Sequence, residues 1–511
     1  MVKLRKHQEE QLNFLKRKFP GRIPLAIESD TGSGKTITIL YFIKEYFEEH
    51  KGEDFTIVLT TGFNKLVHQF AKEARTKFGI EPIIWLGKAC VTCGLKLMKK
   101  EKLNEFPEVS LEHPAFQTDR SLWPKDKSCF KKCRHFDQCF YNVAKAQMNE
   151  IGPKFIITNH SSYLLGLKNH ILMPDICFVD EAHTFAQFYE SFLKIEITKS
   201  EIEYINSILD SKDPTFFLFK RCIERGLKMS PQLFAQVKKR IQRLPDKDGL
   251  NSNLIARLER FSEETPSVDK YIEVSPNGIE ITKFWSSYEV SQGSIKYALF
   301  SATQDDFTLE MFGVPRSRLY KERGYSAIDY TKSDFLVIPE ERFQDGISKF
   351  LKIMNAEGKN KGLVLSTTLV DIKYMDGLGV VEGFKTFKDA EEFQKYKGKA
   401  ILIGSRVFFQ GIDIPDLEFV CLNRIPFPTY NDKFRAQAKY LEEVANMNAW
   451  TKFTIPLVKN DITQTLGRLW RRKGDKGTVA IMDPRLLDKF KYMLDYVKEV
   501  RKGINVRIID Q

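Results

Sequence analysis

The stretch "ESDTGSGKT", Glu28 to Thr36, decides how the rest of the sequence is interpreted. It follows the apolar run "IPLAI" and precedes "TITILYFIKEYFEE", whose apolar residues recur at helical spacing. A glycine-rich loop between a strand and a helix directs backbone N–H groups and the helix N-terminus at phosphate oxygens. The sequence therefore predicts a nucleoside-triphosphate site in which Lys35 contacts the β- and γ-phosphates and the Thr36 hydroxyl ligates Mg²⁺. The remaining residues of the predicted phosphate loop are Thr31, Gly32, Ser33 and Gly34.

Short apolar runs that end in polar residues recur on both sides of this loop. The first part of the chain contains "IPLAIES", "FTIVLTT", "KFIITNH", "DICFVDE" and "KYALFSAT". A second set contains "DFLVIP", "KGLVLSTT", "KAILIGS", "EFVCLNR" and "GTVAIMD". This rhythm is typical of buried parallel strands that carry functional groups at their carboxyl ends. We therefore expect two α/β halves, each built on a parallel sheet.

Two segments interrupt the strand rhythm of the first half. Residues 88–150 have no strand pattern of their own and carry a group of cysteines. Residues 195–265 look helical, and "SPQLFAQVKKRIQRL" has a serine N-cap followed by proline at the first helical position. The run "KYIEVSPNGIEITKFW" then predicts two strands around an Asn-Gly turn. Both segments are interpreted as insertions into the first α/β half.

Acidic and basic motifs complete the predicted nucleotide site. In "VDEAH", at the end of one predicted strand, Asp180 can hold Mg²⁺ through its water shell and Glu181 can orient an attacking water. In "QTLGRLWRR", Arg468 and Arg471 are three positions apart, so on a helix they would share one face. Two arginines brought from the second half can stabilise charge on a γ-phosphate during its transfer.

Composition limits the class of protein. A chain of 511 residues is long enough for two to four domains. Its net charge of +13 favours a polyanionic partner over a membrane surface. No apolar run approaches the length of a membrane span, and the first thirty residues read as a charged amphipathic helix rather than a signal segment. We therefore expect a cytoplasmic protein without a membrane partner.

Five clustered cysteines allow two metal sites. Cys90 and Cys93 together with Cys129 and Cys133 form C-x₂-C…C-x₃-C, which is close to a zinc ribbon. Cys93, Cys129, Cys133 and Cys139 would instead supply four thiolates for a [4Fe–4S] cluster. Spacing alone favours zinc. Cys177, Cys222 and Cys421 lie in apolar or helical runs and are expected to be core residues.

Residues 216–243 contain eight basic residues and one acidic residue. They are either a solvated helix face or a surface that neutralises DNA phosphates along a strand. Aromatic residues near the cysteines could stack on bases, although packing of a small domain explains them equally well. These aromatic residues are Trp85, Trp123, Phe130, Phe136, Phe140 and Tyr141.

An ordered series of motifs carries a family resemblance along nearly the whole chain. It comprises "RKHQEEQ" with Gln8, "TGSGKT", "VDEAH", "SAT", "FFQGIDIPD" at 408–416, "RIPFP" at 424–428, "QTLGRLWRR" and "GDKGTVAIMDPR" at 474–485. This series resembles the superfamily 2 helicases, and within them the XPD/DinG-type iron–sulfur helicases. The resemblance implies two RecA-like motor domains, the first of which carries an iron–sulfur insertion and a mostly helical arch insertion. In this chain we expect the arch to be short, and we expect no nuclease domain before the first motor domain.

The resemblance implies further site residues and ligands. Gln8 would sense adenine, Asp413 would contact the nucleotide, and His183 and Gln464 would join the catalytic group. "GKACVTC" and "CRHFDQCFYNVAKAQ" resemble the family's cluster-binding segments, so the resemblance favours the [4Fe–4S] set over zinc. ATP and Mg²⁺ are the other implied cofactors. Single-stranded DNA and DNA junctions are the implied partners of a monomeric motor, which would move 5′→3′.

The expected domain boundaries follow from the same comparison. Motor domain 1 comprises 1–87, 146–193 and 293–320, interrupted by the cluster domain at 88–145 and the arch at 194–292, and motor domain 2 comprises 321–511. The leading functional hypothesis is an ATP-driven DNA helicase. Two alternatives are a nucleoprotein remodeller that does not separate strands and a non-enzymatic nucleic-acid-binding scaffold.

Overall fold

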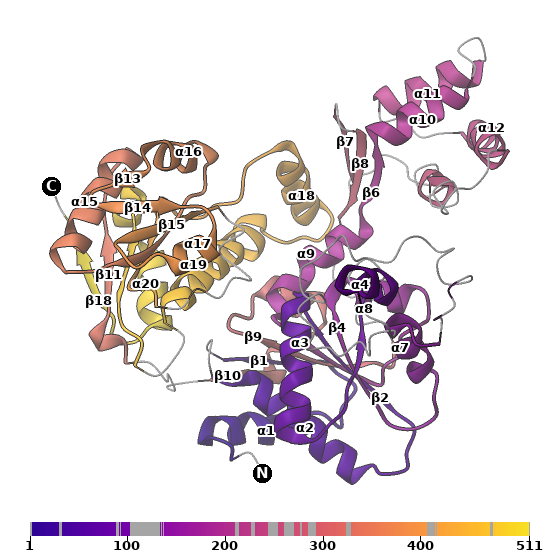
Figure 1. Cartoon of the computed structure of the whole chain (residues 1–511), viewed down its shortest axis with the longest axis horizontal. Helices are drawn as coiled ribbons and strands as arrows, with labels where there is room; N and C mark the ends of the chain where they lie inside the picture. The colour runs from indigo at the N-terminus through magenta and orange to yellow at the C-terminus, as the bar shows by residue number, and fades with distance from the viewer. Residues whose placement is uncertain are drawn as a thin grey trace.

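The structure is a computed structural model. It describes residues 3–29, 33–87, 91, 93–102, 133, 135, 137–209, 214–225, 230–243, 254–259, 270–275, 278–284, 293–322, 329–405, 414, 416–470 and 474–509. In these ranges the chain forms two large α/β units and a smaller unit that projects from one of them (Figure 1).

The first large unit is built on a seven-stranded sheet in the order β10-β1-β9-β5-β2-β4-β3, and every pairing in it is parallel. Its central strands are buried on both faces, as expected for a parallel sheet covered by helices. The strands are β1 (Leu25–Glu28), β2 (Thr56–Thr61), β3 (Ile83–Trp85), β4 (Lys154–Asn159), β5 (Ile176–Asp180), β9 (Lys296–Ser301) and β10 (Leu319–Lys321).

Helices cover both faces of this sheet because alternate strand residues point to opposite sides. Ile57 and Phe178 pack with α1 (Lys6–Lys18), α2 (Lys35–Glu49) and α3 (Asn64–Glu73). Val58 and Cys177 pack on the other face with α8 (His160–Lys168), α9 (Ala182–Leu193) and α14 (Asp306–Met311). Two further helices of the first half are α4 (Gly94–Glu101) and α7 (Phe140–Met148).

The second large unit has eight strands in the order β13-β14-β15-β12-β16-β17-β11-β18. Six of its seven pairings are parallel and β13–β14 is antiparallel, so this sheet is mixed where we predicted a purely parallel one. The strands are β11 (Asp334–Val337), β12 (Lys361–Leu365), β13 (Val380–Val381), β14 (Phe384–Phe387), β15 (Ala400–Gly404), β16 (Phe419–Leu422), β17 (Thr478–Ile481) and β18 (Asn505–Ile508). The expected α/β class with two sheets is confirmed.

The helices of this second unit again lie on both faces. One core contains residues of α19 (Ile455–Leu469) and α20 (Lys491–Val500), and the other contains residues of α15 (Phe343–Ala356) and Met375 of α16 (Leu369–Leu378). The remaining helices are α17 (Ala390–Lys395) and α18 (Asp432–Glu443). In Figure 1, α18 lies on the side of this unit that faces the projecting one.

The projecting unit combines an antiparallel sheet, β6-β8-β7, with helices (Figure 1). Its elements include β6 (Ile195–Thr198), β7 (Lys270–Ser275), β8 (Gly278–Lys283), α10 (Lys199–Ile208), α11 (Pro214–Arg225), α12 (Pro231–Gln242) and a short helix at 254–259. The β7–β8 pairing confirms the predicted hairpin, and the Ser230 side chain caps α12 by accepting from the N–H of Leu233. The prediction that residues 195–265 are helical is wrong at β6, where Ile195 and Ile197 are buried against β8.

Charged side chains join this projecting unit to both large units. Lys433 of α18 lies 2.6 Å from Glu190 of α9 and 3.6 Å from Glu280 of β8. Lys194, at the end of α9, lies 2.6 Å from the same Glu280. The ring of Tyr440 in α18 also packs against Phe284, with 5.8 Å between ring centroids. α18 therefore contacts the base of the projecting unit directly.

Several short helical segments connect these elements. They are η1 (Ala74–Phe78) and η8 (Trp450–Thr454), which are π-helical, and η5 (Arg316–Arg318), η6 (Tyr330–Lys332) and η9 (Pro484–Leu487), which are 3₁₀-helical. Within the part of the chain that the structure describes, every helix is too short or too polar to cross a membrane.

We predict that Gly362→Ala lowers the free energy of unfolding by about 1–3 kcal/mol, the usual cost of overpacking a core. A Cβ at Gly362 in β12 would lie 1.8 Å from Cε2 of Phe419, which is fully buried between Phe350 and Phe384. Urea denaturation measures the change. The control is Gly377→Ala, since a Cβ there has no neighbour within 4 Å and alanine favours the helix. Equal stability of Gly362→Ala and the native chain would contradict this packing.

Candidate active site

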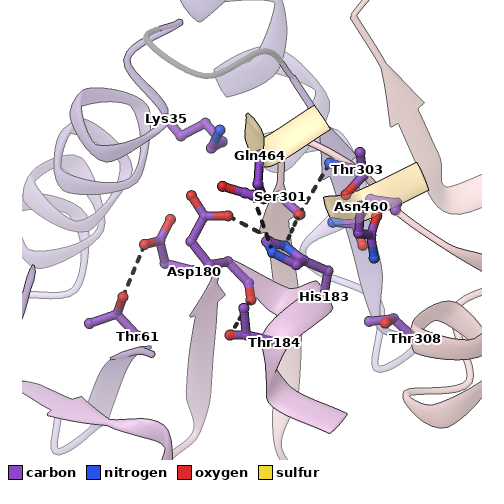
Figure 2. Close-up of polar contacts among 12 residues, drawn as sticks. Lys35, Thr61, Asp180, His183, Thr184, Ser301, Thr303, Thr308, Asn460 and Gln464 are labelled. Carbon is purple, nitrogen blue, oxygen red and sulfur yellow. Dashed lines mark hydrogen bonds and ion pairs between the residues drawn. The ribbon is translucent and has the colours of Figure 1, made fainter. Parts of the chain in front are cut away.

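Polar residues converge at the carboxyl edge of the first sheet because β1, β9 and β5 are adjacent and parallel. Glu28 ends β1, Ser301 ends β9 and Asp180 ends β5. Figure 2 shows Asp180, His183 and Ser301 gathered at this edge, with Lys35 beside Asp180 and Gln464 approaching from the second large unit. The sequence motifs that follow these three strands therefore meet at one site.

The described part of the phosphate loop is held by hydrogen bonds from its neighbours. Gly34 has φ 88°, a left-handed conformation that glycine adopts without strain, and it is the N-cap of α2. The Ser29 and Ser33 hydroxyls lie 2.9 Å apart. Lys35 is only 8% exposed, and its Nζ donates to the Ser29 carbonyl at 3.1 Å. Thr36 is the second residue of α2, whereas Thr31 and Gly32 lie outside the described residues.

Gln8 lies against this loop. Its Nε2 donates to the backbone carbonyls of Ser33 at 3.2 Å and Gly34 at 3.4 Å, and its Oε1 accepts from the N–H of Arg5. A Cβ at Gly34 would lie 2.2 Å from Gln8 Nε2, so only glycine permits this contact. The structure thus brings Gln8 to the nucleotide loop, while its predicted role in sensing adenine stays a prediction.

Asp180 is buried beside two groups that favour its ionised form. Its Oδ2 accepts from the Thr61 hydroxyl at 3.2 Å (Figure 2), and Lys35 acts on it electrostatically. Burial and the neighbouring Glu181 nevertheless raise the pKa of Asp180 well above its ordinary value of 3.8. A buried carboxylate of this kind is stabilised by a cation, and oxygen ligands are those that Mg²⁺ prefers.

Glu181 has φ 50° and ψ 47°, which is rare for a residue with a side chain. Such a conformation costs on the order of 1–3 kcal/mol and persists only where its surroundings enforce it. Here it ends β5 and serves as the N-cap of α9, so the chain turns sharply between strand and helix. The turn brings Glu181 Oε2 to 3.4 Å from Nδ1 of His183.

His183 connects the two large units. Its Nε2 lies 3.3 Å from Nε2 of Gln464, and its Nδ1 lies 2.7 Å from the Ser301 hydroxyl (Figure 2). Because the Gln464 amide nitrogen can only donate, His183 Nε2 is the acceptor, and the imidazole proton resides on Nδ1. The Ser301 hydroxyl also accepts from the N–H of Thr303 at 3.2 Å. The His183 imidazole thus links the end of β5, the end of β9 and helix α19.

Arg468 is also brought to this site by α19. It is buried, and burial lowers its pKa to about 10, while Glu181 acts in the opposite direction. α19 ends at Leu469 and Trp470 is extended, so the expectation that Arg468 and Arg471 share one helix face stays a prediction. The ring of Trp470 packs in the core against Tyr330. Arg471 and Asp413 lie outside the described residues.

Other contacts hold the two large units together around this site. Asn460 of α19 donates to Asp305 at 3.3 Å, one turn before Gln464. Lys452 lies 2.9 Å from Asp306 and 3.5 Å from Glu310. The ring of Phe453 packs on Phe307 with 5.3 Å between centroids. The segment between β9 and β10 therefore provides much of the first unit's contact with α19 and the residues before it.

Three of the predicted metal-binding cysteines, Cys93, Cys133 and Cys139, are among the described residues. Cys93 is the N-cap of α4, and Cys139 is the N-cap of α7. Burial raises the pKa of the Cys139 thiol, the backbone N–H groups of Asn142 and Tyr141 lower it, and the charges of Cys93 and Cys133 raise it. Cys90 and Cys129 lie outside the described residues, and the described ones contain no group of three or more His, Cys, Asp or Glu placed to hold a metal ion.

Two functional neighbours of Asp180 and His183 were not predicted from the sequence. His160 is completely buried, and its Nδ1 lies 2.9 Å from the Thr60 hydroxyl. Burial and the nearby His183 lower the pKa of His160 to about 3. Thr61 supports Asp180, as described above. The polar ends "LTT" and "TNH" were the only signal in the sequence, and they do not reveal which strands become neighbours.

Known proteins resemble the chain in sequence over both large units. Residues 1–207 match the family model "Type III restriction enzyme, res subunit", and residues 347–502 match the model of the helicase C-terminal domain. The chain is 25% identical over 211 residues to "3'-5' exonuclease DinG" of Bacillus subtilis and 27% identical over 189 residues to "ATP-dependent DNA helicase DinG" of Photobacterium profundum. These matches cover 38% and 32% of the chain and only 23% and 27% of the relatives, so the chain matches about a quarter of their length.

Solved structures resemble the whole chain in fold. The structure titled "XPD_Helicase" superposes with a TM-score of 0.65 and 14% identity, and the match covers all of both chains. "Structure of S. tokodaii Xpd4" superposes with a TM-score of 0.60 and 14% identity, covering 99% of this chain and all of the other. Because both structures are only 14% identical to the chain, they establish its fold alone.

Two α/β units with a shared polar site therefore match a helicase C-terminal domain model in the second half and a restriction-enzyme subunit model in the first. The chain is similar to DinG proteins in sequence and to XPD in fold, and this combination is the one that the XPD/DinG-type superfamily 2 helicases show. The resemblance inferred from the sequence motifs is confirmed.

We predict that His160 makes the protein less stable as the pH falls below about 6.5. The folded state keeps His160 neutral down to about pH 3, whereas the unfolded chain binds the proton near the ordinary value of 6.5. The free energy of unfolding should therefore fall by up to about 1.4 kcal/mol per pH unit through this group. Urea denaturation between pH 5 and 7.5 measures the slope.

His160→Gln should have a shallower slope than the native chain, and His170→Asn, at an exposed left-handed position, should keep the native slope. An unchanged slope in His160→Gln would mean that His160 gains its proton without cost in the folded state.

Proposed function

We propose that the protein is an ATP-driven motor that moves along single-stranded DNA and separates strands. The observation that carries the proposal is the meeting of Asp180, Glu181 and His183 from the first sheet with Gln464 and Arg468 from the second. A site shared by two units can close when nucleotide binds and open after it is hydrolysed. This cycle couples ATP hydrolysis to relative movement of the two units. The DinG relatives and the XPD fold support the same conclusion.

Each described residue has a defined part in this proposal. Lys35 leaves the Ser29 carbonyl to contact the β- and γ-phosphates of ATP. Glu181, held in place by its left-handed backbone, orients the water that attacks the γ-phosphate. Mg²⁺ bound by Thr36 and through the water shell of Asp180 supplies positive charge that offsets the charge of the phosphate oxygens. Both side chains carry oxygen donors of the kind this ion prefers, which supports the assignment.

Arg468 and Gln464 make the site depend on the second unit. A guanidinium beside Glu181 can stabilise the charge that develops on the transferred phosphoryl group. Gln464 donates to His183, which in turn donates to Ser301 at the end of β9. We assign Arg471 and Asp413 to the same site from the motif resemblance alone.

Lys35→Ala and Glu181→Gln should each abolish DNA-stimulated ATP turnover. Glu181→Gln should still bind nucleotide, because it preserves the size of the side chain and leaves the phosphate loop unchanged. Turnover is measured by phosphate release and binding by equilibrium titration with a fluorescent ATP analogue. The matched control is Lys44→Ala on the same helix, whose side chain lies beside Glu48, and it should keep native turnover. Substantial turnover by either site variant would remove the site assignment.

DNA would bind across the units as a polyanion. Along α12, Lys239 is exposed, while Lys238 lies 3.5 Å from Glu259 and is partly neutralised. Because Lys238 is partly neutralised, fewer positive charges are available to bind DNA phosphates than the charge count of residues 216–243 suggested. The 5′→3′ direction, binding to junctions, a monomeric state and the domain boundaries given above remain predictions from the family resemblance, and a cytoplasmic location remains a prediction from the sequence. A remodeller without strand separation remains the alternative, and strand- and protein-displacement assays run side by side distinguish the two.

We also propose that Cys93, Cys129, Cys133 and Cys139 hold a [4Fe–4S] cluster. Three of these thiols interact electrostatically, and two of them begin helices α4 and α7. A zinc ribbon made by Cys90, Cys93, Cys129 and Cys133 has no use for Cys139, whereas the motif resemblance assigns Cys139 to the cluster set. When bound, the cluster supplies covalent cross-links that a segment with little apolar core otherwise lacks.

Cys139→Ser and Cys133→Ser should each yield protein with little iron and little visible absorption when purified without oxygen. Cys90→Ser should keep both, because Cys90 is outside the proposed ligand set. A zinc ribbon predicts the reverse, with colourless native protein that loses zinc in Cys90→Ser and keeps it in Cys139→Ser. Iron and zinc analysis of the native chain and the three variants decides between these outcomes.

A further inference from the structure

A cavity of about 400 Å³ opens beside the candidate active site, at the same edge of the first sheet. Its lining comes from the segments after β2, β3 and β4 and from one residue of α9, and none of the lining residues is charged. The lining residues used below are Gly62, Phe63, Asn64, Gly87, Asn159 and Phe188. A cavity without charge is unsuited to a phosphate or a carboxylate and suits a neutral guest.

Two aromatic rings form one side of the cavity. Phe63 and Phe188 meet edge to face, with 6.5 Å between ring centroids and 79° between their planes. Phe188 is supported from behind by His160, whose ring centroid lies 5.3 Å away. Both phenylalanines are only partly buried, so each retains accessible ring surface. A flat guest can therefore stack on one ring and meet the edge of the other.

A hydrogen-bond donor is positioned at the cavity. Asn159 is held at both ends of its amide, since its Nδ2 donates to Asn64 Oδ1 at 2.6 Å and its Oδ1 accepts from the N–H of Ser162 at 2.6 Å. These bonds orient the Asn64 amide, and its Nδ2 has no hydrogen-bond partner among the residues that the structure describes. A guest with an acceptor on its edge can occupy this donor.

Two glycines keep the cavity open. A Cβ at Gly62 would lie 3.3 Å from Thr184 Oγ1 and 3.5 Å from Cε2 of Phe188, so a side chain there would press on the aromatic wall. A Cβ at Gly87 would meet only Ser162 Oγ, at 3.5 Å. A longer side chain at Gly87 would therefore fill the cavity without displacing the chain around it.

We propose that this cavity binds one nucleobase of the single strand on which the motor moves. The proposal rests on the proposed function, which supplies a strand with neutral, planar bases next to its charged backbone. Every base has a face for stacking and at least one acceptor on its edges, so one ring pair and one amide donor accept any of them. The cavity therefore holds the strand by its bases without selecting a sequence.

The test compares two strands of equal length, oligothymidylate and the same sugar–phosphate chain without bases. Phe188→Leu removes the stacking surface, and Gly87→Leu fills the cavity while leaving both rings in place. Each variant should bind oligothymidylate roughly tenfold more weakly than the native chain, which corresponds to the loss of about one stacked base. Each should bind the strand without bases as the native chain does. Binding is measured by fluorescence anisotropy without nucleotide, so that the motor does not move.

The matched control is Gly377→Leu in α16, where an added Cβ has no neighbour within 4 Å, and it should bind both strands like the native chain. Native affinity for oligothymidylate in both cavity variants would overturn the inference. Equal weakening on both strands would also overturn it, because these residues would then act on the backbone or on folding. Failure of the native chain to bind any strand would overturn the proposed function as well, so the two failures are distinguishable.

Discussion

The hydrogen bond from Gln464 to His183 is the contact on which the candidate site depends. Neither sheet contains a complete site. The first provides the phosphate loop and the carboxylates, and the second provides the amide and the guanidinium that α19 carries. His183 contacts Ser301, Glu181 and Gln464 together. Separation of the two sheets by a few ångströms would leave each set of groups in place but unable to act on one nucleotide.

The same short segments serve the site and the neighbouring cavity. Thr61 ends β2 and donates to Asp180, and the next two residues begin the cavity lining. Helix α9 follows Glu181, carries His183 in its first turn and presents Phe188 to the cavity between one and two turns later. Because a helix of this length moves as a rigid body, a rotation of α9 that shifts His183 also shifts Phe188.

Much of this arrangement could be predicted from the sequence, because long apolar runs with polar ends identify parallel strands. The phosphate loop, "VDEAH" and "SAT" were assigned to strand ends, and these ends do lie together. β6 was missed because it is only four residues long and its last residue, Thr198, forms a capping box with Glu201 that starts α10. The end of α19 at Leu469 could not be predicted, because helical spacing in the sequence does not reveal the contact of Trp470 with Tyr330. The contacts of His160 with Thr60 and of Gln464 with His183 join residues 100 and 281 positions apart in the sequence. Local sequence patterns cannot specify such contacts.

The position of β9 has a consequence for synthesis of the chain. β9 lies between β1 and β5 in the sheet, yet it follows both in sequence and comes after the whole projecting unit. At ~5–20 residues per second, the ribosome needs on the order of ten seconds to proceed from β5 to β9. During that interval β1 and β5 both present unpaired edges, and the nascent first half has no central strand to join them. The strands of the projecting unit all precede β9, and the pairing of β8 with both β6 and β7 brings the chain back toward the gap before β9 is added.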